Sequence, residues 1–194
     1  MKEDPGHTRS FIAIQIPDTV KALFLDLQGK LKKSGIHASF PSPETLHLTL
    51  KFLGHISPGD IGTIEKSMEK AVTGILPHTL FASGIGVFPS VKHARIIWSG
   101  IRGETGNLEK LASKLDFILL KAIGVKKEEK RFRPHLTLAR VKKEVAPESV
   151  IKMIKTFENF QTPGFSVSGI SLFQSELSSS GAVHKQISFI HFLH

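Results

Sequence analysis

Apolar residues recur along the chain with two different periods, and these predict alternating strands and helices. Residues 11–16 (FIAIQI) form a short run of β-branched and aromatic side chains that Pro17 ends, which is typical of a buried strand. Apolar positions from Val20 to Leu31 then recur every three to four residues, as on one face of a helix. The same patterns predict strands at residues 45–53, 79–88, 94–101, 134–141, 164–173 and 183–192, helices at 19–33, 58–72, 105–123 and 147–157, and a loop at 178–181.

The order of these elements indicates the fold class. The order is strand, helix, strand, helix, two strands, helix, strand, helix, two strands, and the runs of adjacent strands between helices favour an α+β protein with largely antiparallel sheets. A chain of 194 residues suits one domain or two small lobes around a shared core. Fourteen Phe and one Trp can anchor such a core. We therefore expect residues 1–194 to form a single domain.

Composition and charge narrow the class of function. The chain has no Cys, which excludes disulfides and any Cys-based zinc site or nucleophile, and it has no Gly-rich phosphate-binding loop. A net charge of +9 favours polyanionic partners such as nucleic acid. The first ten residues are polar, without the apolar core of a signal peptide, and the apolar runs are too short to span a bilayer. We expect a cytoplasmic protein that does not associate with membranes.

The candidate chemistry lies in a repeat. Residues 46–50 (LHLTL) and 134–138 (PHLTL) are nearly identical and place His47 and His135 88 residues apart. A His-Leu-Thr-Leu sequence is expected only about 0.006 times by chance in a chain of this composition, whereas a bare His-x-Thr is expected about 0.6 times. Similar predicted elements surround both copies. The chain therefore reads as two related halves, each with one His-x-Thr strand.

Strand geometry gives the repeat a chemical meaning. Side chains alternate along a strand, so His47 shares a face with Thr49, and His135 with Thr137, while the intervening leucines point into a core. If the halves face each other, two imidazoles and two hydroxyls converge on one cleft. One imidazole could then activate water and the other protonate a leaving oxygen, with the hydroxyls donating to anionic oxygens. A strained five-membered cyclic phosphodiester fits this set.

The two motif histidines could alternatively be metal ligands. Neither motif has Asp or Glu two residues after its histidine, and no third ligand is evident in the pattern. We therefore predict metal-independent acid–base catalysis without a cofactor.

These motifs together resemble the two-histidine phosphoesterase superfamily, and more closely its RNA 2′,3′-cyclic phosphodiesterases, formerly called 2′-5′ RNA ligases. The resemblance extends from residue 9 to residue 193. It is carried by residues 9–14 (RSFIAI), 46–54 (LHLTLKFLG), 88–90 (FPS), 95–98 (RIIW) and 131–140 (RFRPHLTLAR).

The resemblance implies a bilobal, pseudo-symmetric α+β fold in which antiparallel sheets line a central cleft and helices lie outside. It also implies that His47 is the proton donor and His135 the proton acceptor, and that Thr49, Thr137 and Arg140 hold the phosphate. The product would be a 2′-phosphomonoester, and reversal would join RNA ends by a 2′-5′ linkage. RNA ends with a cyclic phosphate, including tRNA fragments, would be the partners of a monomeric enzyme.

Strand alternation predicts on which face of its strand each of two cationic residues, Arg140 and Lys51, lies. Arg140 lies five positions after His135, so an ideal strand places it on the opposite face unless a bulge intervenes. Lys51 lies four positions after His47 and is expected on its face, as a possible RNA contact. Arg131 and Arg133 precede the second motif and are further possible RNA contacts. His184 stands where the family often has Tyr, which puts a base-stacking or orienting role there in doubt.

Two other functions remain open at this stage. The fold could serve as a non-catalytic RNA-binding module, although intact His and Thr in both motifs argue against that reading. The substrate could also be a small cyclic nucleotide or a 2′-5′ oligonucleotide, because the motif residues would contact the phosphate and not the rest of the molecule that carries it.

Overall fold

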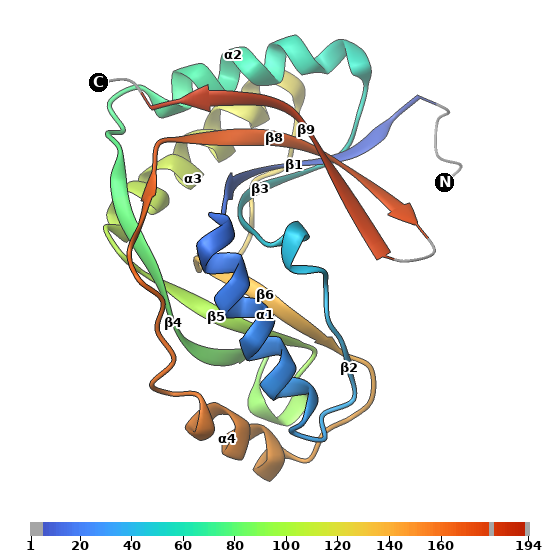
Figure 1. Ribbon diagram of the computed structural model, residues 1–194. Coiled ribbons are helices and arrows are strands. Elements are labelled where there is room, and N and C mark those ends of the chain that lie inside the picture. Colours follow the sequence, from blue (N-terminus) through green and yellow to red (C-terminus); the bar gives the residue numbers. More distant parts are fainter. Residues whose placement is uncertain (1–5, 179–180, 193–194) are drawn as a thin grey trace.

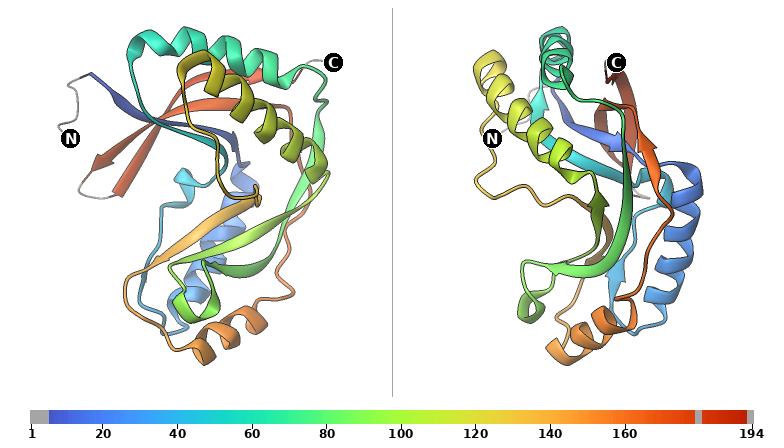
Figure 2. Two further views of the ribbon diagram at one scale, coloured as in Figure 1. Left: turned by 180° about the vertical axis from the view of Figure 1, so that it is seen from behind. Right: turned by 90° about the vertical axis from the view of Figure 1, so that its left-hand side faces the viewer.

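The structure is a computed structural model that describes residues 6–178 and 181–192. It is an α+β fold built around two antiparallel sheets, one above the other in Figure 1, with helices on their outer sides (Figures 1 and 2). This is the fold class that the order of predicted elements indicated. Within the described residues, no helix is both long and apolar enough to cross a membrane.

The first sheet carries the first His-x-Thr strand at its edge. Its strands, in spatial order, are β3 (His47–Ile56), β1 (Thr8–Gln15), β8 (Gly169–Ser178) and β9 (Gly181–His191). Two helices that pack against each other cover it, α2 (Ile61–Val72) against β8 and β9 and α3 (Thr105–Ile123) against β3. The sheet therefore has one covered face and one that looks toward the second sheet.

The second sheet carries the other motif. Its strands, in spatial order, are β2 (Ala38–Ser39), β6 (His135–Val141), β5 (Ile96–Gly103), β4 (His78–Phe88) and β7 (Phe165–Val167). Helix α1 (Asp18–Lys32) packs against β6 and α4 (Pro147–Thr156) against β4. Short 3-10 turns occur at η1 (Pro43–Thr45), η2 (Pro58–Asp60) and η3 (Val91–His93).

The leucines of the two motifs anchor one shared core. Leu48, Leu50, Leu136 and Leu138 are all nearly or fully buried and belong to a single apolar cluster that draws on both sheets. Strands β3 and β6 are also in contact. Burial of the leucines from both strands therefore turns the histidines toward the space between the sheets.

One predicted strand proved to be two. Residues 164–173 were expected as a single strand, but β7 pairs with β4 in the second sheet and β8 pairs with β1 in the first. The chain crosses between the sheets at Ser168, which a local pattern of apolar residues does not reveal. Of the predicted loop at 178–181, residues 179 and 180 lie outside the described residues, and its flanking residues belong to β8 and β9.

Candidate active site

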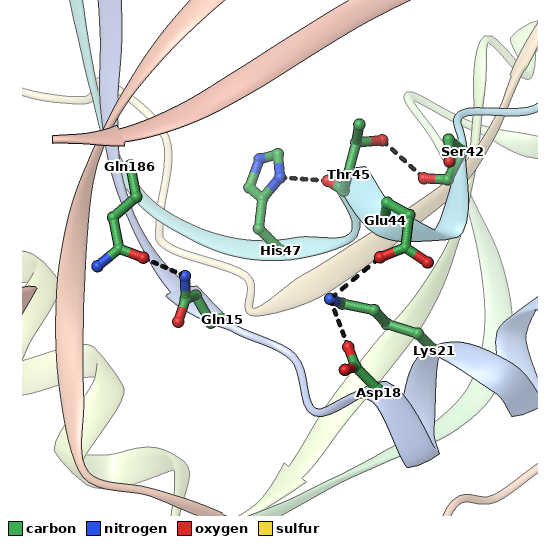
Figure 3. Close-up of polar contacts among 8 residues, drawn as sticks. All are labelled: Gln15, Asp18, Lys21, Ser42, Glu44, Thr45, His47 and Gln186. Atoms are coloured by element: carbon green, nitrogen blue, oxygen red, sulfur yellow. Dashed lines mark hydrogen bonds and ion pairs between the residues drawn. The ribbon is translucent and has the colours of Figure 1, made fainter.

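The two motif histidines are held in the same way. His47 is the first residue of β3, and its Nδ1 lies 2.7 Å from the carbonyl oxygen of Thr45 in turn η1 (Figure 3). His135 is the first residue of β6, and its Nδ1 lies 2.6 Å from the carbonyl oxygen of Arg133. A carbonyl can only accept, so each Nδ1 carries the proton and donates it. Each neutral imidazole therefore has an unprotonated Nε2 available for proton transfer.

Aromatic rings fix the planes of both imidazoles. Phe11 stacks on His47 with ring centroids 4.5 Å apart, and His184 meets the same ring in a T-shaped contact with centroids 5.1 Å apart. Phe88 meets His135 edge-on at 5.0 Å, and Trp98 lies 6.3 Å away. The backbone bond and the packed rings together leave each histidine little rotational freedom, which is what a proton-transfer group requires.

A bulge follows the threonine in each motif. In the β1–β3 pair, Ala13 is opposite Thr49 but Ile12 is opposite Lys51, so Leu50 is an extra residue. In the β5–β6 pair, Trp98 is opposite Thr137 but Ile97 is opposite Ala139, so Leu138 is extra in the same way. An extra residue transfers every later side chain of that strand to the other face.

The bulge at Leu138 places Arg140 on the face of His135 and Thr137. Its side chain is exposed, and its positive charge is close enough to His47, on the other sheet, to lower the pKa of that imidazole. Without a bulge, strand alternation would place Arg140 on the face opposite His135. The bulge at Leu138 therefore allows Arg140 to reach the cleft.

The matching bulge at Leu50 makes the prediction for Lys51 wrong. Lys51 does not share the face of His47; it is only 1% exposed and lies in the core side of the sheet. Its Nζ lies 2.6 Å from Asp116 Oδ1 and donates to the carbonyl of Lys126 at 2.6 Å. Phe52 takes the place on the cleft face instead, with 54% of its surface exposed. Lys51 is therefore a buried structural cation and no RNA contact.

The remaining cationic candidates lie on the loop before β6. Arg131 and Arg133 both have exposed side chains, and Arg131 is 3.6 Å from Glu109. Arg133 contributes to the site through its backbone carbonyl, which orients His135. The structure thus leaves both guanidinium groups at the surface beside the second motif.

Three residues near His47 had no predicted role. His184 lies against its ring, and Gln15 is directly opposite it in the β1–β3 pair. Gln15 Nε2 donates to Gln186 Oε1 of β9 at 2.5 Å (Figure 3). Gln15 is the single polar residue of the apolar run 11–16, so the sequence alone could have marked it as a candidate site residue. The approach of Gln186 to Gln15 depends on the pairing of three strands and could not have been predicted in this way.

Burial keeps the imidazoles neutral. The pKa of His47 is lowered to about 4, mainly by desolvation and also by the nearby charges of His184, Arg140 and His135, while the bond to the Thr45 carbonyl opposes the shift. Burial also lowers the pKa of His135, against the bond to Arg133. Charges on His184 of the first sheet and on Arg140 and His135 of the second are thus near enough to His47 to affect its pKa.

The described residues contain no cluster of three or more His, Cys, Asp or Glu side chains arranged to hold a metal ion. The arrangement offers one imidazole that can accept a proton from a reactant and another that can donate one, with Arg140 as a cation nearby.

Comparison with known proteins agrees with this geometry. The sequence model of LigT-like phosphoesterases matches two segments, residues 14–98 and 102–184, and each segment contains one of the two His-x-Thr motifs. The chain belongs to the LigT-like phosphoesterase family. It is therefore a member of a family of phosphodiester-cleaving enzymes, as its motifs led us to expect.

Curated relatives and solved structures extend the similarity over nearly the whole chain. It is 30% identical to the RNA 2′,3′-cyclic phosphodiesterase of Methanothermobacter thermautotrophicus, covering 91% of this chain and 94% of the relative. It is 31% identical to the protein of the same name from Archaeoglobus fulgidus, covering 92% and 97%. The crystal structure of TT0787 from Thermus thermophilus superimposes with a TM-score of 0.78 at 24% identity, covering 95% of this chain and 97% of the other.

Proposed function

We propose that this phosphoesterase is an RNA 2′,3′-cyclic phosphodiesterase that opens the terminal cyclic phosphate to a 2′-phosphomonoester. The observation that carries the proposal is the matched pair of imidazoles, each with its Nδ1 bound to a backbone carbonyl and its Nε2 without a hydrogen bond to any residue that the structure describes. The curated relatives that bear this name cover more than nine-tenths of the chain, which supports the same substrate class.

The reaction needs one proton accepted and one delivered. His135 takes a proton from water as the water oxygen attacks phosphorus, and the bond from phosphorus to the ribose 3′ oxygen breaks. Protonated His47 delivers its proton to that 3′ oxygen, leaving the phosphate on the 2′ oxygen. The assignment of donor and acceptor follows the family pattern, and it places the nucleoside on the His47 side and the attacking water on the His135 side.

The phosphate oxygens would be held from both sheets. Thr49 and Thr137 share the faces of their histidines, and Arg140 reaches the same face through the bulge at Leu138. Hydroxyl and guanidinium donors in this position stabilise the negative charge that builds up on the phosphorane-like transition state. Arg131 and Arg133 are proposed as more distant contacts to the RNA backbone.

Substrate binding would supply the proton that His47 needs. With a pKa of about 4, His47 is neutral near pH 7 in the free protein. A phosphodiester carries one negative charge, and placing it against His47 offsets the repulsion from Arg140 and favours the imidazolium. The anionic substrate therefore raises the pKa of its own general acid.

The reaction can be tested by phosphorus NMR of an RNA with a 2′,3′-cyclic phosphate, incubated with the protein in EDTA. We expect conversion to the 2′-monophosphate. A 3′-monophosphate would overturn the leaving-group assignment. Binding without conversion would favour the rival reading, a non-catalytic RNA-binding module. Adding a 5′-hydroxyl RNA tests the reverse reaction, 2′-5′ ligation.

The finer predictions from the sequence belong to the same proposal. They are that the enzyme acts in the cytoplasm as a monomer and that tRNA fragments are among its substrates. Light scattering of the purified protein tests the state of assembly, and sequencing of RNAs that retain a cyclic phosphate in a deletion strain tests the substrates.

A further inference from the structure

A cavity opens beside His47 that the proposed reaction does not use. Its volume is about 420 Å³, within the range of small-ligand sites. It lies between the end of β1, turn η1, the start of β3 and the crossing at Ser168. Its lining includes His47 but neither threonine of the motifs, nor His135, nor Arg140. Whatever fills this cavity therefore touches the catalytic imidazole without occupying the phosphate position.

The surroundings of His135 in the second sheet differ from those of His47. The position opposite His135 is Gly100, where the first sheet has Gln15 opposite His47. The ring of Trp98 lies flat over Gly86, so close that a Cβ at Gly86 would be 2.3 Å from the indole. Phe88 packs on the same indole, with ring centroids 5.0 Å apart. Aromatic side chains therefore pack around His135, whereas a cavity of ligand size lies beside His47.

The charges in the cavity argue against a phosphate. Apart from the histidines, the basic residue in the cavity lining is Lys21. Its Nζ lies 2.8 Å from Asp18 and 3.7 Å from Glu44 (Figure 3). Two carboxylates for one ammonium give this part of the wall a negative balance, which repels an anion. A neutral ligand fits better.

A lining amide, a second amide bonded to it from outside the lining, and several rings give the cavity the character of a base-binding site. Gln15 lines it, and its Nε2 is bound to Gln186 Oε1. The remaining Gln15 Oε1 and Gln186 Nε2 make no hydrogen bond to the part of the chain that the structure describes. They form an adjacent acceptor and donor, the pattern that an amide uses to read a nucleobase edge. The rings of Phe173, Phe189 and His184 supply flat walls.

A second flat surface lies on the other side of the catalytic residues. Along β3 the order is His47, Thr49 and then the exposed Phe52, whereas the cavity extends the opposite way, toward Thr45. Phe52 occupies in β3 the position that Arg140 occupies in β6, next to the proposed phosphate site. The terminal base can stack there, which leaves the cavity one nucleotide away from the phosphate.

We infer that the cavity binds the base of the nucleotide immediately 5′ to the one that carries the cyclic phosphate. This inference rests on the proposed function and makes it more specific: the substrate is an oligonucleotide end, and a cyclic mononucleotide leaves half of the site empty. Gln15 and Gln186 are the residues that hydrogen-bond the penultimate base.

The test compares kcat/KM for two substrates, adenosine 2′,3′-cyclic phosphate and the dinucleotide ApA with the same cyclic end. We expect wild-type protein to prefer the dinucleotide at least about tenfold. Gln15→Ala and Gln186→Ala should each lower that preference about three- to tenfold, the loss expected for one hydrogen bond. Both side chains are exposed, so neither change should disturb folding.

Two further variants sharpen the comparison. Gln174→Ala removes an amide from the opposite face of the same sheet and should leave the preference unchanged. Ser168→Trp fills the mouth of the cavity from an exposed position and should abolish the preference. Equal kcat/KM values for the two substrates in the wild type, or a preference that is undiminished in both Gln variants, would overturn the inference.

Failure of the proposed function can be told apart from failure of this inference. If neither substrate is turned over, the affinities of the corresponding 2′-phosphates, ApA 2′-phosphate and adenosine 2′-phosphate, are measured by titration calorimetry. Tighter binding of the dinucleotide that Gln15→Ala weakens about three- to tenfold would still support the cavity as a base site. Equal binding would refute it.

Discussion

Lys51 and Arg140 lie at nearly matching places in the two motifs, and the paired bulges predict opposite roles for them. We expect Lys51→Met to lower stability and leave catalysis intact. We expect Arg140→Met to weaken catalysis and leave stability intact. The two variants remove the same charge, so they are matched controls for each other.

The magnitude for Lys51 follows from its surroundings. Its ammonium is buried against Asp116, which is 20% exposed, and Glu128 lies 3.8 Å away with 51% exposed. Breaking a buried ion pair costs about 3–5 kcal/mol. Because Asp116 and Glu128 can partly rehydrate, we expect about 2–3 kcal/mol, or a fall in Tm of about 5–10 °C.

The magnitude for Arg140 follows from the bond it is proposed to make. Its side chain is exposed, so its loss should change the free energy of unfolding by no more than about 0.5 kcal/mol. A charge-assisted hydrogen bond to phosphate contributes about 1.5–3 kcal/mol, which corresponds to a loss of about 10- to 150-fold in kcat/KM.

Urea unfolding and kcat/KM measured well below the melting transition separate the two effects. In a double-mutant cycle, Asp116→Asn should cost much less in the Lys51→Met background than in the wild type, because the ion pair is already gone. If Lys51→Met keeps full stability and loses tenfold or more in kcat/KM, Lys51 faces the cleft and the bulge at Leu50 is misplaced.

The remaining predictions concern the imidazoles and the substrate. His47→Ala and His135→Ala should each lower kcat about 10²- to 10⁴-fold while RNA affinity persists, and wild-type turnover by either variant would refute the mechanism. In the free protein the acid form of His47 is lost as pH rises through about 4. Therefore kcat/KM should fall about tenfold per pH unit above about 6.5; a flat profile between about pH 7 and 9 would contradict this assignment. The same depressed pKa means that the unfolded chain binds this proton more tightly, so stability should fall as pH is lowered from 6.5 toward 4, measurable by urea unfolding. RNA affinity should weaken with added salt because phosphate contacts carry it, and salt-independent binding would exclude RNA as the ligand.

Most of the elements, the repeat and the shared orientation of the two motif histidines could be predicted from the sequence because each depends on local pattern. Alternation within residues 46–50 and 134–138 turns each histidine and threonine away from the leucines. Because those leucines are buried in the core, the histidines and threonines face the space between the sheets. The near identity of the two copies also indicated a pair of related halves. No knowledge of distant contacts was needed for these conclusions.

Tertiary structure alone decided which side chains join the histidines. The bulges at Leu50 and Leu138 are defined only against β1 and β5, so whether Lys51 or Phe52 faces the cleft depends on pairing with another strand. The crossing at Ser168 and the meeting of Gln15 with Gln186 likewise depend on partners more than 80 residues apart along the chain. A sequence pattern reports what one segment prefers, whereas register and the space left beside His47 arise from how separate segments pack against one another.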